Sequence, residues 1–196
     1  MRRSTFCQIT GMEDGRLAGL KQRGALPFAL PEDDRRAKKR IEYSFQRAVL
    51  FVAYDQLTQG GVAHETAARL VRELDRGQKL ASRSRELLED APDRELWLFA
   101  AADAAGGFSF LHVGAIEECA ELYALKAQAD REVGRPAAAG HVIATNLREA
   151  MRKVLDRVAA MGGIEDELRE DELARRAAYR LDAADAGASS AAGERG

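Results

Sequence analysis

The sequence predicts a mainly helical α+β protein that begins with two short helices and a basic ribbon. Apolar residues recur at helical spacing between residues 44 and 76, and glycines stand where the helices should end. Two dense apolar runs within residues 95–113 have the strand pattern, with a turn between them. A long amphipathic stretch at 147–161 predicts a helix behind this hairpin.

These elements divide the 196 residues into four parts. Residues 1–77 are expected to form a helix-turn-helix with a basic wing, and the charged residues 78–94 a linker. Residues 95–162 are expected to form a small α+β domain that serves dimerisation or sensing. Residues 163–196 begin as a charged helical segment and end in Ala, Gly and Ser, which have little to bury, so we expect a disordered tail.

The first part opens with two short helices joined by a tight turn at Thr10-Gly11. Gly11 can adopt the positive φ angle that such a turn requires. Asp14 stands where a residue could cap the second helix, which should run to about Arg23. Gly24 then occupies the position of a C-cap glycine, so we expect the helix to end there.

A polar, turn-prone stretch follows from Pro27 to Tyr43. Its basic residues stand within six positions: Arg35, Arg36, Lys38, Lys39 and Arg40. The residues after them alternate with period two, which predicts a β-hairpin, or wing, with its tip at 31–37. Cations on such a hairpin are well placed to contact phosphate groups.

Two amphipathic helices complete the first part. Residues 44–61 carry apolar side chains at helical spacing, with Ser44 as a possible cap and Gly60-Gly61 as the end. After a short link, residues 65–77 repeat the helical pattern. We expect both helices to pack behind the helix-turn-helix.

The second part is predicted to begin with the hairpin 95–113. Phe108, Phe110 and His112 alternate along its second strand, and such aromatic residues usually form one side of a core. A small-molecule pocket that includes Trp97 and Tyr123 is the alternative to core or dimer-interface packing.

The rest of the second part contains one ambiguous segment and one clear helix. Residues 115–128 fit either a helix or an extended segment, and 134–140 is predicted to be a loop. A third strand is expected at 141–145, and Asn146 is a good cap for the helix 147–161.

Charge is distributed unevenly along the chain. Residues 1–47 contain 11 Lys and Arg against 6 Asp and Glu, a balance of +5. The remaining residues contain 19 against 26, a balance of −7, so the whole chain has a net charge of −2. A basic N-terminal part on an acidic body indicates that the N-terminal part alone faces a polyanion.

Several functional classes are not expected from the residues. No run of about 18 apolar residues is present, and no apolar segment follows the first arginines, so neither a membrane span nor a secretory signal is predicted. Cys7 and Cys119 match no metal-ligand spacing, so we expect reduced thiols in a cytoplasmic protein. His64, His112 and His141 have no partner at a catalytic spacing, so we predict no enzyme, cofactor or metal site.

The spacing of several motifs over residues 5–76 resembles the winged helix-turn-helix of MerR-type regulators. The matching residues are Thr10-Gly11-Met12, Leu17, Arg23-Gly24-Ala25-Leu26-Pro27, Tyr43-Ser44-Phe45, Ala48-Val49 and Leu57-x-x-Gly60-Gly61-Val62. The resemblance implies that the second helix enters the major groove, that the wing grips flanking phosphates, and that a homodimer binds a two-fold symmetric site. Metal-sensing members use C-terminal cysteines, and only Cys119 is available here.

The chain also departs from this family. Ala18, Gly19 and Leu20 stand where members have an arginine and aromatic residues, and Ile41 replaces an arginine of the wing. Gly15 and Gly19 each cost a helix about 0.5–1 kcal/mol relative to alanine. Two alternatives to a regulator therefore stay open. One is an excisionase-like or phage architectural DNA-binding protein, and the other is a protein–protein adaptor without DNA binding.

The expected partner is double-stranded DNA. Arg16, Lys21 and Arg23 are predicted to act at or beside the groove. The residues predicted to contact phosphates, which supply affinity and register, are Arg35, Arg36, Lys38, Lys39, Arg40 and Tyr43.

Overall fold

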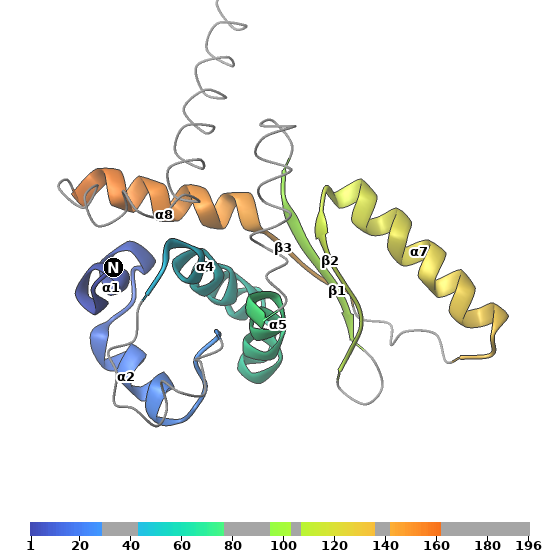
Figure 1. Ribbon diagram of the computed structural model, residues 1–196, viewed down its shortest axis with the longest axis horizontal. Helices are drawn as coiled ribbons and strands as arrows, with labels where there is room; N and C mark the ends of the chain where they lie inside the picture. Colours follow the sequence, from blue (N-terminus) through green and yellow to red (C-terminus); the bar gives the residue numbers. More distant parts are fainter. Residues whose placement is uncertain (29–42, 77–94, 103–106, 136–141, 162–196) are drawn as a thin grey trace, which may run out of the picture.

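The computed structural model describes residues 1–28, 43–76, 95–102, 107–135 and 142–161. Within these ranges, a group of helices packs on one face of an antiparallel sheet and a further helix covers the other face (Figure 1). The α+β class is therefore confirmed. Nearly all of the predicted wing, the linker and the C-terminal tail lie outside the described residues.

The two N-terminal helices form as predicted. Helix α1 (Arg3–Thr10) ends at Gly11, which has a φ of 71°, and helix α2 (Asp14–Gln22) follows at once. Gly24 has a φ of 64° and its N–H donates to Lys21, so α2 ends where expected. The predicted cap is wrong: Asp14 is the first residue of α2, and its carboxylate forms an ion pair with Arg3 at 2.6 Å.

Helix α4 (Phe45–Gln59) is the centre of the helical layer. The hydroxyl of Ser44 accepts from the N–H of Arg47 at 3.2 Å, which confirms the predicted cap. Nine of its side chains are buried, distributed around the helix, because α1, α5 and α8 all pack against it. Helix α5 (His64–Arg76) follows and packs on α4.

The sheet contains three strands in the order β2-β1-β3 among the described residues. Strand β1 (Trp97–Ala102) lies in the centre and pairs antiparallel with β2 (Phe108–Gly114) and β3 (Val142–Asn146). Both predicted strand regions of the hairpin and the third strand are therefore confirmed. The ambiguous segment is a helix, α7 (Ile116–Glu132), which packs on β2 and β1.

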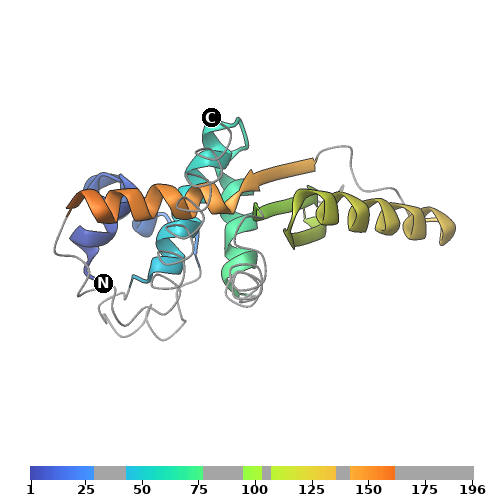
Figure 2. The ribbon, with the colours of Figure 1, turned by 90° about the horizontal axis from the view of Figure 1, so that it is seen from above.

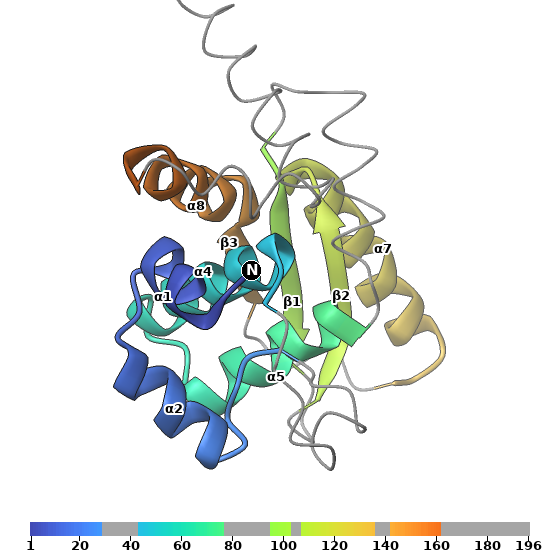
Figure 3. The same cartoon turned by 60° about the vertical axis from the view of Figure 1, so that its left-hand side comes forward.

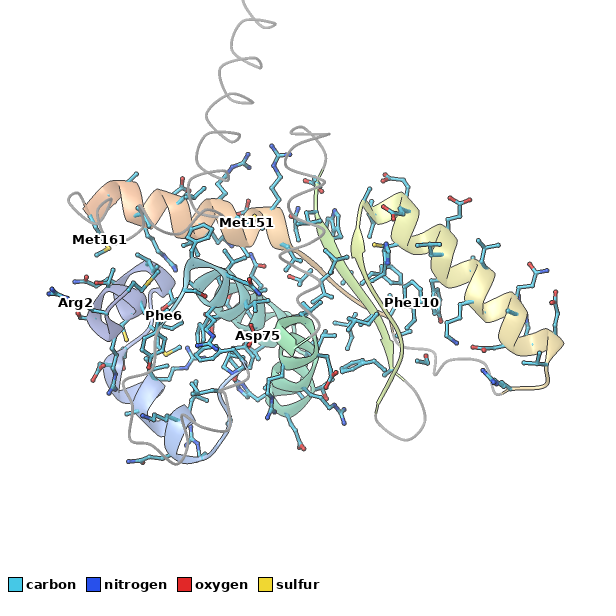
Figure 4. All side chains as sticks on the ribbon, in the orientation of Figure 1. Arg2, Phe6, Asp75, Phe110, Met151 and Met161 are labelled. Atoms are coloured by element: carbon cyan, nitrogen blue, oxygen red, sulfur yellow. The ribbon has the colours of Figure 1, made fainter. Side chains whose placement is uncertain are left out.

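A register shift in the hairpin changes which face its aromatic residues occupy. The shift lies between Ala101 and Ala102, opposite the start of β2. Phe108 consequently packs against the main core, with the guanidinium of Arg69 5.4 Å from its ring centroid. Phe110 lies on the α7 side (Figure 4). The prediction of one aromatic face for these residues and His112 is therefore wrong for Phe108.

The α7 side of the sheet holds a second, smaller aromatic group. Phe99, Phe110 and Tyr123 pack with ring centroids 5.6–6.0 Å apart. His112 lies beside them, and its Nε2 is 3.0 Å from the carboxylate of Glu118. This packing favours the core interpretation of Tyr123 over a ligand pocket.

Helix α8 (Leu147–Met161) joins the sheet to the helical layer. The side chain of Asn146 accepts from the N–H of Glu149 at 3.0 Å, which confirms the predicted cap. Seen from above, α8 continues the path of β3 and runs across the helices (Figure 2). It packs on α4 and α1, so residues on both sides of the predicted linker share one hydrophobic cluster. In the described ranges, no helix is both long and apolar enough to cross a bilayer.

Candidate nucleic-acid interface

Helix α2 lies at the outer edge of the helical layer, on the side of the molecule away from α7 (Figure 3). Only Leu17 and Leu20 of its residues are buried, at 1% and 7% exposure. Burial of a leucine contributes about 1.5–3 kcal/mol, so these two side chains contribute much of the packing energy of α2. With respect to the described residues, the rest of its surface is exposed or partly exposed.

The outward surface of α2 and its C-terminal end combines glycines with exposed basic side chains. A Cβ atom added at Gly15 would meet nothing within 4 Å, and one added at Gly19 would meet only the Arg23 guanidinium, at 3.6 Å. Lys21 and Arg23 are exposed, and within the described ranges neither forms an ion pair with an acid. A partner could therefore approach the helix backbone closely while meeting two exposed positive charges.

Arg16 is held differently from the other two predicted groove residues. Its Nη2 lies 3.0 Å from the Asp55 carboxylate on α4, and both side chains are partly exposed. A pair of this kind contributes about 0–1 kcal/mol, so Arg16 can leave Asp55 for a phosphate at small cost. Arg16 and Lys21 thus lie on α2 and Arg23 directly follows it, and among the described residues Arg16 alone of the three forms an ion pair with another element.

Behind Arg16, a buried tyrosine connects α4 to the start of α5. The hydroxyl of Tyr54 lies 2.9 Å from Nδ1 of His64. Burial raises the pKa of Tyr54 above its ordinary value of 10.0; Arg16 opposes this shift and Asp55 adds to it. Tyr54 is therefore a neutral hydrogen-bonding group that fixes the helices behind α2.

The predicted phosphate-binding cations lie outside the described residues, but both neighbours of their segment are described. Phe28 precedes residues 29–42 and Tyr43 follows them. Both rings pack against Phe6 of α1, with centroids 6.0 and 4.5 Å away, and the two rings lie 6.2 Å from each other. The segment with Arg35, Arg36, Lys38, Lys39 and Arg40 therefore leaves and rejoins the described structure at one point beside α1.

Tyr43 has a different environment from the one predicted. It is 5% exposed and its ring stacks on Phe6, and burial raises its pKa above the ordinary value of 10.0. A ring packed in this way anchors the chain. We therefore leave Tyr43 out of the DNA surface proposed below.

Two arginines join the region although the sequence did not single them out. Arg47 lies with its guanidinium carbon 5.3 Å from the Phe28 ring centroid, and Arg157 of α8 donates to the carbonyl of Ile9 at 3.3 Å. Proximity to the predicted wing could have indicated Arg47. No local signal distinguishes Arg157 from the other arginines of α8.

The described part of the chain offers little support for a reactive thiol or a metal site. Cys7 and Cys119 are both buried free thiols, and burial together with the neighbouring Asp14 raises the pKa of Cys7 above 9.0. No cluster of three or more metal-ligating side chains occurs in the described ranges. A scan against family models finds no match for the chain, and a search of curated proteins finds none either.

Proposed function

We propose that the chain is a cytoplasmic, sequence-specific DNA-binding transcription regulator that resembles the MerR type. In this proposal α2 enters the major groove, and residues 29–42 form a wing whose cations contact the flanking phosphates. Lys21 and Arg23 act at the groove, and Arg16 joins them when it leaves Asp55.

One observation carries the proposal: the exposed α2 and both attachment points of the basic segment lie on the same small body. Phe6 of α1 packs against Phe28 and Tyr43, and α2 follows α1 after a tight turn. The charge of this region fits a polyanion, because residues 1–28 contain five Lys and Arg against two Asp and Glu.

The test begins with the selection of fragments of the source genome that the full chain retains at low salt. The affinity for a selected duplex is then measured by fluorescence anisotropy at several salt concentrations. For the double variant Lys21→Gln/Arg23→Gln we expect binding to weaken by about 1–3 kcal/mol where a base is read. The salt slope should fall by about 0.9 for each phosphate that the variant no longer neutralises.

A matched control removes the same charge far from α2. Arg131 and Arg135 are exposed at the end of α7, so Arg131→Gln/Arg135→Gln should leave both affinity and slope unchanged. Equal effects in the two double variants would mean that only net charge matters and would contradict the assigned interface.

The wing is tested in the same assay. Replacing Lys38, Lys39 and Arg40 together by Gln should weaken binding to every sequence and lower the salt slope, because phosphate contacts carry no sequence information. A triple variant with unchanged affinity and slope would remove these residues from the proposal.

We propose that the protein binds DNA as a homodimer, as two-fold symmetric sites require. Among the described residues, the exposed large apolar side chains are found on α7, just after it, and on β3: Leu122, Leu125, Val133 and Val142. A second copy that covers these side chains would remove them from water.

One observation favours a protein–protein adaptor as the second candidate. Gly15, Ala18 and Gly19 leave α2 without long side chains over much of its outer surface, and such a surface also allows a helix of another protein to pack closely. Failure of the full chain to retain any genomic fragment at low salt would favour the adaptor.

A further inference from the structure

Helix α8 connects the sheet to α1. Its first residues are fixed to the sheet, because the N–H of Leu147 donates to the carbonyl of Leu96 at 2.7 Å. Its apolar side chains then pack on α4 and α1, and Met161 at its far end lies above α1 (Figure 4). The helix therefore reaches the turn between α1 and α2 from a distant part of the chain.

Arg157 makes the contact at that turn. Its Nη1 donates to the carbonyl of Ile9 at 3.3 Å, across 148 positions of sequence. Carbonyls in the last turn of a helix have no partner within the helix, so a cation that donates to one also stabilises the negative end of the helix dipole. The guanidinium thus completes the C-terminal end of α1.

The same guanidinium lies directly against the turn glycine. A Cβ atom placed on Gly11 would be 2.9 Å from the guanidinium carbon and from Nη2 of Arg157. Gly11 has a φ of 71°, and α2 begins at Asp14, only three residues later. Because α2 buries only Leu17 and Leu20 and is otherwise held by exposed ion pairs to Arg3 and Asp55, its orientation depends strongly on the geometry of this turn.

We infer that Arg157 is a positioning residue, which holds the α1–α2 turn and so sets the orientation of α2 from α8. The turn can be observed without DNA, because Cys7 of α1 is 7% exposed and its Sγ lies 3.9 Å from the carboxylate of Asp14. A thiol reagent should label Cys7 faster when the contact between α1 and α2 opens locally. Cys119, a buried residue of α7, is an internal reference in the same molecule.

The experiment compares Arg157→Met with the full-length wild type by the labelling rate of each cysteine, measured by mass spectrometry. Removal of this one partly exposed hydrogen bond should raise the labelling rate of Cys7 about three- to tenfold while the rate of Cys119 stays unchanged. Arg157→Lys keeps a cationic donor and should stay near the wild-type rate. The control Lys153→Met removes an exposed charge one turn earlier on α8 and should change neither rate.

Several results would overturn the inference. An unchanged Cys7 rate in Arg157→Met would remove the positioning role. Equal acceleration at Cys7 and Cys119 would identify a general loss of stability, and a rate for Arg157→Lys as high as for Arg157→Met would exclude the hydrogen bond as the cause.

The consequence for DNA rests on the proposed function and is measured separately. Arg157→Met should weaken binding to a selected duplex several-fold with an unchanged salt slope, because Arg157 acts through α2 and makes no phosphate contact. A slope reduced by about 0.9 would make Arg157 a direct phosphate ligand and would contradict its role as a positioning residue. If the wild type binds no DNA, the proposed function fails, and the cysteine rates still decide the inference.

Discussion

Substitutions of Tyr43 can distinguish two roles. The sequence predicts a contact to phosphate, whereas the buried environment of the ring indicates an anchor for the chain. As a phosphate ligand, Tyr43 would act through its hydroxyl group, so Tyr43→Phe should weaken DNA binding without a loss of stability. As an anchor, it acts through its ring, so Tyr43→Phe should be nearly neutral and Tyr43→Ala severe.

The expected magnitude follows from the packing of the ring. Tyr43 is 5% exposed, stacks on Phe6 at 4.5 Å and meets Phe28 edge-on at 6.2 Å. Removal of a buried aromatic side chain costs about 3–5 kcal/mol, and the broken aromatic pairs are included in that figure. Because a domain of this size has a total stability of about 5–15 kcal/mol, Tyr43→Ala should lower the free energy of unfolding by a large fraction.

Urea denaturation followed by far-UV circular dichroism measures this free energy, and anisotropy measures DNA affinity on the same samples. We expect Tyr43→Phe to stay within about 1 kcal/mol of the wild type in both. A decrease of less than about 1 kcal/mol in Tyr43→Ala would refute the anchoring role. A stable Tyr43→Phe with weakened DNA binding would restore the predicted phosphate contact.

Three further predictions address pH, a helix cap and the oligomeric state. Burial raises the pKa of Cys7 and Tyr54 above 9.0 and 10.0, so the unfolded chain loses these protons first. The contribution of these two groups to the free energy of unfolding should be fully present below pH 9 and be lost above it, and Cys7→Ala should remove the earliest part of that fall in denaturation series. Asn146→Ala should lower this free energy by about 1 kcal/mol, whereas Asn146→Asp should keep the cap. Leu125→Glu should convert a wild-type dimer to a monomer in sedimentation velocity, and a dimer that survives it would place the interface elsewhere.

Local signals in the sequence identified most of the helices and strands, because each of those signals acts over a few residues. Ser44 and Asn146 cap their helices as expected, since a cap needs only a side-chain oxygen and the amides of the next turn. Asp14 is instead the first residue of α2, after Glu13 at the N-cap position, and its carboxylate forms an ion pair with Arg3 on the preceding helix. That ion pair depends on how α1 and α2 pack, which no local pattern encodes.

The faces of the sheet were harder to predict than its strands. Alternation assigns Phe108 and Phe110 to one face, but a single shifted residue opposite Ala102 moves Phe108 to the other. The residue that the register skips is Ser109, between Phe108 and Phe110, and a serine in a strand carries no signal specific enough to locate such a shift. A one-residue change of register is therefore enough to separate one aromatic residue from its neighbours.

The sequence indicated the cations of the candidate interface but not the residues that hold its helices in place. A cation is expected at a surface whatever lies behind it, so Lys21 and Arg23 could be identified from helical spacing and net charge. Arg157 could not, because its hydrogen bond to Ile9 joins residues 148 positions apart and exists only once α8 has packed on α1.

The shared core also decides how a DNA-binding role has to be tested. The predicted boundary at residue 77 separates α4 from α8, yet Ala150, Met151 and Val154 of α8 belong to the same hydrophobic cluster as α4. A fragment that stops at residue 77 would expose the surface of α4 that α8 covers and would lack the guanidinium at Gly11. Weak binding by such a fragment would therefore report the absence of α8, and only the full chain can show whether α2 binds DNA.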